Sequence, residues 1–295
     1  QTTNGAYGAI YALSQNGTTT ITNSGTISSD DWSGIDVGTG SADVTINNSG
    51  TISADDYQAV RANSVATDGF TLVNSGTITA ASTGVYLYQS EGATVTNSGT
   101  IRVTNGHDAI WTAYTDDITI TNSGTLRSDT GYAMSSIGYS GGENMTLTNT
   151  GTIQGSTYDL HTSSNTGIGT LSNDQGGDDA LKLYGYLPVL YKIIVNSTSD
   201  FGKLAVTGQN GDMTFGIHTS SALAATTYSD VITGVSSSNI TSGTTGTVTA
   251  SNGVFTWELN NSSGNDWDLV VSEDSTDPTL SSSTPADNAT GVAVN

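Results

Sequence analysis

The strongest constraint on this chain is a seven-residue motif at residues 21–27, Ile-Thr-Asn-Ser-Gly-Thr-Ile, which recurs with little change up to residue 153. Its asparagine returns at intervals of 23 to 27 residues. A period of this length is typical of solenoid proteins, in which each repeat forms one coil and stacks on the next. The recurring asparagines are Asn23, Asn48, Asn74, Asn97, Asn122 and Asn149.

Each repeat carries three apolar positions. The residue two before the asparagine is always aliphatic, and the residue three before it is always threonine, which is the alternation of a half-buried strand. A second aliphatic position lies four residues after the asparagine. The third ladder consists of Ile10, Ile35, Val60, Val85, Ile110, Met134 and Leu160. Each repeat is therefore expected to form three strands.

Strands this short cannot bury their apolar faces alone, but stacking turns each ladder into a strip of core. We therefore predict an all-β chain that begins with a right-handed parallel β-helix of about seven coils over residues 1–175. The asparagines are expected to exchange amide hydrogen bonds along the axis, and the motif glycines to supply a tight bend.

Residues 176–275 change in composition. Alternating segments such as Leu181–Tyr184 and Trp267–Val271 predict further strands, and all three lysines lie in this region. Because the ends of a β-helix leave strand edges unpaired, we interpret residues 176–275 as a β-rich C-terminal cap domain.

Charge and composition exclude several classes of partner. Asp and Glu number 27 against 6 Lys and Arg, giving a net charge of -21. Nucleic acids and anionic membranes require clustered basic residues, so neither is an expected partner. No apolar run is long enough for membrane insertion, and cysteine is absent, which excludes disulfides.

The repeat resembles the β-helical passenger regions of bacterial autotransporters and related giant adhesins. Residues 199–208 and 227–234 are similar to the cap that closes such passengers. Residues 276–295 resemble a linker followed by the start of a bacterial Ig-like module. The resemblance implies a protein that is secreted or displayed on the bacterial cell surface, and it implies adhesion rather than catalysis.

Polysaccharide lyases and hydrolases also use parallel β-helices, with clustered carboxylates and basic residues on one face. The repeat region offers only Arg61, Arg102 and Arg127, and the repeat places no carboxylate pair near them. We therefore predict no catalytic residues and no enzyme activity.

A metal site is conceivable at one corner of the coils. Asp30, Asp31, Asp55 and Asp56 occupy equivalent positions in successive repeats, so stacking would bring four carboxylates together. Oxygen-only ligands suit Ca²⁺. The simpler alternative, a solvated acidic corner, is favoured, and no other cofactor is expected.

Aromatic residues suggest a binding face. Tyr11, Tyr86 and Trp111 follow the third ladder by one residue and Tyr88 follows it by three, which places them on the outward face of the strand. Exposed rings there could stack on sugars or on a neighbouring subunit; the alternative is that loops cover them. A second stripe precedes the same ladder by three residues and consists of Tyr7, Trp32, Tyr57 and His107.

These observations favour a non-catalytic extracellular adhesin or structural passenger that contacts glycans or other surfaces. The main alternative is a self-assembling surface-layer or filament subunit with Ca²⁺-mediated contacts. A polysaccharide-degrading enzyme and an ice-binding protein are less favoured. The outward Thr-x-Thr pairs suit ice binding, but Asn47 and Val73 interrupt them.

Overall fold

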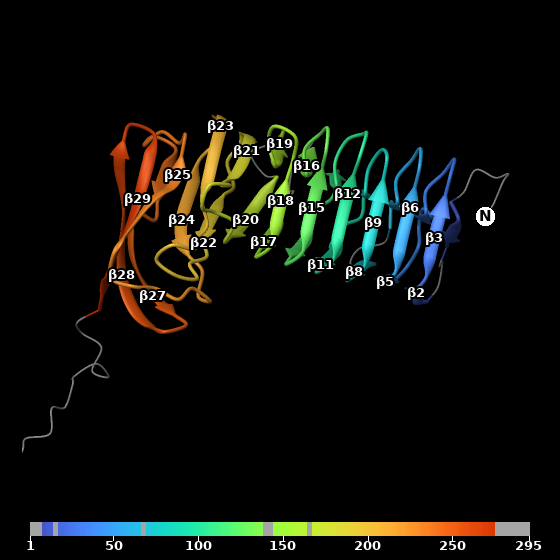
Figure 1. The fold of residues 1–295 in the computed structure, drawn as a ribbon, viewed down its shortest axis with the longest axis horizontal. Helices are drawn as coiled ribbons and strands as arrows, with labels where there is room; N and C mark the ends of the chain where they lie inside the picture. The colour runs from blue at the N-terminus through green and yellow to red at the C-terminus, as the bar shows by residue number, and fades with distance from the viewer. Residues whose placement is uncertain (1–7, 14–16, 66–68, 138–143, 164–166, 275–295) are drawn as a thin grey trace, which may run out of the picture.

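The computed structural model describes residues 8–13, 17–65, 69–137, 144–163 and 167–274. It is an all-β parallel β-helix of about nine turns, elongated along the stacking direction (Figure 1). The predicted fold class is confirmed. The described residues before 175 contribute seven strands to sheet A, from β1 (Ile10–Ala12) to β19 (Leu160–Thr162), which matches the predicted seven coils, and parallel stacking continues beyond residue 175.

The strands form three sheets. Sheet A contains, in spatial order, β1 (Ile10–Ala12), β4 (Ile35–Val37), β7 (Val60–Asn63), β10 (Val85–Tyr88), β13 (Ile110–Ala113), β16 (Met134–Ile137), β19 (Leu160–Thr162), β21 (Leu181–Tyr186), β23 (Leu204–Asn210), β25 (Thr227–Thr233), β29 (Asp266–Glu273), β28 (Gly253–Ser263) and β27 (Thr245–Ala250). Sheet B contains β2 (Thr19–Asn23), β5 (Val44–Asn48), β8 (Phe70–Asn74), β11 (Thr94–Asn97), β14 (Thr119–Asn122), β17 (Met145–Asn149), β20 (Ile168–Asn173), β22 (Leu190–Ile193), β24 (Met213–Ile217) and β26 (Ile240–Ser242). Sheet C contains β3 (Thr26–Ser29), β6 (Thr51–Ala54), β9 (Thr77–Ala80), β12 (Thr100–Val103), β15 (Thr125–Ser128) and β18 (Thr152–Gln154).

The three predicted ladders form the core. In sheet A, Ile110 pairs in register with Val85 and Met134, and all three side chains are at most 1% exposed. From the second coil onward the ladders of sheets B and C are buried in the same way and belong to one continuous apolar cluster, against which Ile21 and Ile27 of the first coil pack partly buried. Burial of each such side chain stabilises the fold by about 1.5–3 kcal/mol.

The asparagine ladder is confirmed. Each side-chain amide donates a hydrogen bond to the amide oxygen of the next asparagine, from Asn23 as far as Asn173, over distances of 2.7 to 2.9 Å. Each Nδ2 also donates to the carbonyl oxygen of the residue two positions later in the sequence, as Asn48 does to Gly50. The buried amides are therefore paired along the whole repeat, which removes most of the cost of burying them.

The motif glycines from Gly50 onward are required by coil-to-coil contact. A Cβ atom at Gly99 would overlap the carbonyl oxygen of Gly76, and the same holds for Gly50 above Gly25. None of the six motif glycines has a positive φ. The expected role in a tight bend is therefore served by close backbone approach rather than by an unusual backbone conformation.

The cross-section changes after β18. Sheet C ends there, and the Gln175 side chain pairs with the open edge: its Oε1 accepts from the Ile153 amide at 2.8 Å and its Nε2 donates to the Ile153 carbonyl at 3.1 Å. Sheets A and B continue in parallel as far as β25 and β26, and β27, β28 and β29 close the end as antiparallel strands. These antiparallel strands lie in the last part of residues 176–275, the predicted cap, and the earlier part of that range continues the parallel stacking.

The resemblance to an Ig-like module falls on residues that lie outside the described part of the chain. No helix long and apolar enough to cross a membrane occurs among the residues that the structure describes.

Candidate binding surface

A group of stacked rings lies on the outer face of sheet A, on and just after β10 and β13. Val85 and Leu87 point into the core, so Tyr86 and Tyr88 between and after them point outward. Tyr86 pairs in register with Trp111, and their ring centroids are 4.5 Å apart with an interplanar angle of 13°. Tyr88 lies 6.3 Å from Tyr86 and packs edge-on against Tyr114 at 5.3 Å. We call Tyr86, Tyr88, Trp111 and Tyr114 the aromatic cluster.

Tyr11 is not part of this cluster. It occupies the same outward ladder position, but Asp36 and Arg61 stand between it and Tyr86 in the register of sheet A. Those two residues form an ion pair at 3.0 Å. The Tyr11 ring lies over Gly38 instead, and 42% of the residue is exposed. The structure thus brings together three of the four predicted aromatic residues.

A groove of about 530 Å³ lies beside the aromatic cluster. The groove forms at the outward position three residues before each residue of the third ladder. Two coils have a large side chain there, Tyr57 and His107, and the coil between them has the small Ser82. Burial raises the pKa of the Tyr86 phenol at its wall. The groove is lined by Tyr57, Gln58, Ser82, Thr83, Tyr86, His107 and Trp111.

The second predicted stripe therefore contributes to the same site as the first. Tyr57 and His107 line the groove, and Trp32 packs against Tyr57 with ring centroids 5.7 Å apart. Tyr7, the remaining member of that stripe, lies outside the described residues.

A second aromatic group continues the surface toward the C-terminus. Tyr132 stacks on His161 at 4.6 Å, and Tyr184 lies 5.6 Å from His161 and 5.1 Å from Tyr158. Burial lowers the pKa of His161. Tyr132 and Tyr158 also line a smaller groove of about 300 Å³, together with Thr130, Gly131, Ser156 and Thr157.

Sequence reasoning missed this second group for two reasons. Tyr132 and Tyr158 precede their ladder residues by two positions rather than three, so the shorter turns shift them out of the stripe. Tyr184 follows Leu183, which continues the third ladder only because β21 stacks in parallel on β19. Extension of the third ladder past residue 175 would have identified Tyr184.

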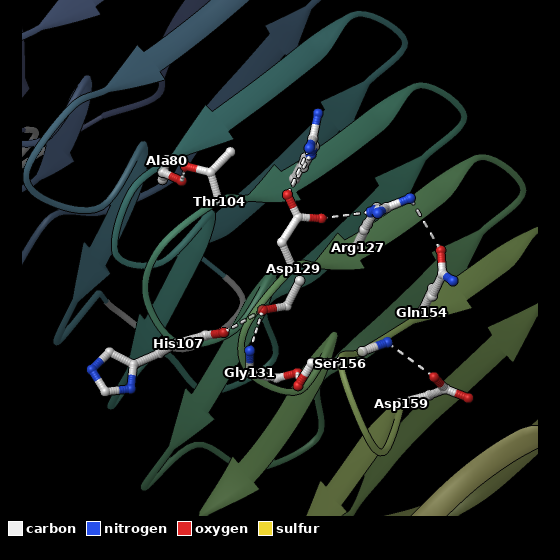
Figure 2. Close-up of polar contacts among 12 residues, drawn as sticks. Ala80, Thr104, His107, Arg127, Asp129, Gly131, Gln154, Ser156 and Asp159 are labelled. Carbon is white, nitrogen blue, oxygen red and sulfur yellow. Dashed lines mark hydrogen bonds and ion pairs between the residues drawn. The ribbon is translucent and has the colours of Figure 1, made fainter.

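Two arginines lie side by side on the outer face of sheet C. Arg102 and Arg127 are paired in register between β12 and β15, as their common ladder position predicts. Asp129 accepts from both: Nη2 of Arg102 lies 2.6 Å from Oδ2, and Nε of Arg127 lies 2.6 Å from Oδ1. Figure 2 shows Arg127 reaching from Asp129 to Gln154, its second partner at 3.3 Å. Hydrogen bonds from Arg102 and Arg127 hold the pKa of Asp129 below its usual value.

The carboxyl group of Asp108 is buried next to Ser135, which lies between the aromatic cluster and the second aromatic group. Asp108 is 5% exposed and accepts a hydrogen bond from the Ser135 hydroxyl. Burial raises its pKa to about 6. Ser135 is the small residue that separates Trp111 from His161 in the outward ladder. The hydrogen bond between Asp108 and Ser135 joins the turn before β13 to β16.

The four aspartates of the predicted calcium site are exposed at one corner of the first coils. The backbone amide of Asp55 donates to the carbonyl of Ser29 at 3.0 Å, which stacks the two turns that carry them. Within the described ranges, no group of three or more His, Cys, Asp or Glu residues is placed to hold a metal ion. A calcium site at Asp30, Asp31, Asp55 and Asp56 remains a prediction from the sequence.

No protein-family model, no curated protein and no solved structure matches this chain. The larger groove offers flat apolar rings, four side-chain hydroxyl groups, an amide and an imidazole along one edge of a rigid sheet.

Proposed function

We propose that this protein is a non-catalytic adhesin or structural passenger of the bacterial cell surface, and that it contacts glycans through the larger groove. The observation that supports this most directly is the in-register stacking of Tyr86 on Trp111 at the wall of that groove. Sugars bind through the apolar faces of their rings, which pack against aromatic side chains, and through hydroxyl groups, which need hydrogen-bond partners.

The groove provides both kinds of contact. Tyr57, Tyr86 and Trp111 offer aromatic surface, and Tyr57 is 41% exposed. Gln58 and His107 offer polar groups at the same wall. The strands beneath are paired on both sides, so the contact residues are held in place before a ligand arrives, which lowers the entropic cost of binding.

The composition of the groove favours binding over catalysis. Glycoside cleavage needs a pair of carboxyl groups at the scissile bond. None of the described residues that line the larger groove is Asp or Glu. The buried Asp108 nearby is enclosed by Ser135 and the turn that contains Tyr132.

A glycan-array screen followed by titration of the best ligand tests the proposal. Trp111→Ala and Tyr57→Ala are each expected to weaken binding about tenfold or more, because buried aromatic contacts dominate such interfaces. Thr121→Ala, on the outer face of sheet B, is the matched control and should bind like the wild type. Thermal unfolding of each variant separates loss of the contact from loss of the fold.

The proposal is wrong if no glycan binds, or if Tyr57→Ala and Trp111→Ala bind as tightly as the control. Release of reducing sugar from a bound polymer would replace it with the enzyme hypothesis.

A further inference from the structure

We propose that the polysaccharide bound at this surface is acidic, and that Arg102 and Arg127 recognise its carboxylate groups. This inference rests on the proposed glycan-binding function and adds the chemical class of the ligand. The observation that carries it is the placement of two in-register arginines next to the turns that form both grooves.

The arginine pair is unusual in this chain. With a net charge of -21, the protein as a whole repels polyanions, and only 6 of its residues are Lys or Arg. Like charges directly opposite each other in a sheet are destabilising. Two of the six basic residues nevertheless occupy such a position, with the single carboxylate of Asp129 between them. The local balance of these three side chains is one positive charge.

The pair is also ordered and available. Asp129 fixes both guanidinium groups, and Gln154 holds Arg127 from the other side. The side chains remain 47% and 45% exposed. Among the described residues, no hydrogen bond engages Nη1 of Arg102 or Nη2 of Arg127. These N–H groups can donate to a carboxylate, and fixed guanidinium groups lose little entropy on doing so.

The turns that follow connect the arginine pair to the grooves. Ser128 directly precedes Asp129, and its hydroxyl donates to the carbonyl of His107 at 2.7 Å. His107 lines the larger groove, and in Figure 2 its ring points away from the arginine pair around the same turn. Thr130, Gly131 and Tyr132 directly follow Asp129 and line the smaller groove. A polymer that lies over this corner can reach aromatic rings and guanidinium groups together.

The test compares polygalacturonate with its fully methyl-esterified form, which has the same sugar backbone without the charge. The wild type is expected to bind the acid about tenfold more tightly than the ester at low salt, since charge-assisted hydrogen bonds are the stronger ones. The double variant Arg102→Gln/Arg127→Gln should lose that preference and keep its affinity for the ester. Added salt should reduce the preference of the wild type.

The double variant Lys192→Gln/Lys203→Gln removes the same number of charges from residues that line neither groove and should keep the preference. Neither lysine forms an ion pair with another described residue. The inference is overturned if the wild type does not prefer the acid, or if both double variants lose the preference equally.

Trp111→Ala separates this inference from the proposed function. If Trp111→Ala loses the ester while the wild type binds acid and ester equally, glycan binding stands and acid recognition fails. If Trp111→Ala keeps both polymers and only the arginine variant loses the acid, the arginines bind carboxylates and the aromatic groove is not the glycan site.

Discussion

The repeat region, residues 8–173, and the C-terminal region, residues 174–274, build one solenoid in two different ways. In the repeat region the coils up to β18 each have three strands and an asparagine that donates to the next one, and from Gly50 onward each of these coils has a glycine that contacts the coil before it. In the C-terminal region sheet C has no strand, and the position of the aliphatic ladder in sheet B is taken by Tyr191 and Phe215. Parallel pairing in sheets A and B continues across the boundary without a break.

The comparison shows that the motif is not required for parallel stacking. The asparagines and glycines specify a third side and a constant cross-section. The amide hydrogen bonds of the asparagines and the close backbone contacts of the glycines repeat only when successive coils keep the same spacing. Once Asn173 donates to the carbonyls of Gln175 and Lys203 instead of another asparagine, the ladder ends. Stacking then depends on backbone pairing and larger apolar side chains.

The two regions also differ in how they satisfy buried polar groups. Every asparagine from Asn23 to Asn149 donates to the next. The Tyr191 hydroxyl is fully buried and has no hydrogen-bond partner among the described residues. The amide of Asn173, which lies near it, is already committed to Gln175 and Lys203. Burial raises the pKa of Tyr191 far above its usual value.

The largest effect is expected from charges placed in the shared core. Ile110→Asp in the repeat region and Leu204→Asp in the C-terminal region should each cost more than about 4 kcal/mol, because each buries an unpaired carboxylate. Both residues belong to one apolar cluster. Chemical denaturation should therefore show one cooperative transition in the wild type and loss of the folded state in both variants. Two separate wild-type transitions would mean that the regions are independent.

Glycine substitution should separate the regions. Gly99→Ala is expected to cost about 3 kcal/mol or more, because the new Cβ overlaps a backbone oxygen of the preceding coil, which cannot move away. Gly216→Ala, in β24, places its Cβ no nearer than 3.8 Å to any other residue and should change stability little. Melting temperatures of the two variants test the comparison, and equal effects would contradict it.

Removing one asparagine should break the ladder. Asn97→Ala takes away the acceptor of Asn74 and the donor to Asn122, so we expect a loss of about 2 kcal/mol in the free energy of unfolding. Asn210→Ala in β23 removes an exposed hydrogen bond to Gly208 and serves as the control. Urea titration measures the free energy of unfolding of both variants. Similar losses in the two would show that the asparagine ladder does not contribute to stability.

Asp108 should make the repeat region pH-dependent. Its pKa is raised from 3.8 to about 6 when folded, so the folded state binds the proton more tightly than the unfolded state. Its contribution to stability is therefore greatest below pH 3.8 and is lost as pH rises through about 6. Between pH 5 and pH 7 this loss should be about 1 kcal/mol.

The comparison with Asp108→Asn isolates that effect from the general relief of negative charge at low pH. The difference in free energy of unfolding between wild type and Asp108→Asn should change across this interval. A constant difference would show that Asp108 titrates as it does in the unfolded chain.

The smallest effect is expected at Tyr191. Tyr191→Phe removes a buried hydroxyl without a partner, so stability should stay the same or rise by up to about 1 kcal/mol. A loss of more than about 1 kcal/mol would show that the hydroxyl is hydrogen-bonded in the folded protein. Denaturation midpoints of the variant and the wild type decide between these outcomes.

Much of the fold followed from the sequence because its signals are local. The asparagine spacing defined the coils, and the alternation around Ile46 and Thr45 defined which face is buried. The C-terminal strands were recognisable one by one, including Met213–Ile217. Their parallel pairing was not, because without a repeated motif the sequence does not state which strand lies beside which.

The sequence by itself determined a three-sided β-helix with its ladders, and it placed Tyr86, Tyr88 and Trp111 on one outward face. Only the tertiary structure decided that Ser82 opens a groove between Tyr57 and His107, that Asp129 joins Arg102 to Arg127, and that the solenoid outlasts its repeat. The physical reason is that periodicity assigns a residue to a face and a coil. The way side chains from different coils then meet depends on turn lengths and packing.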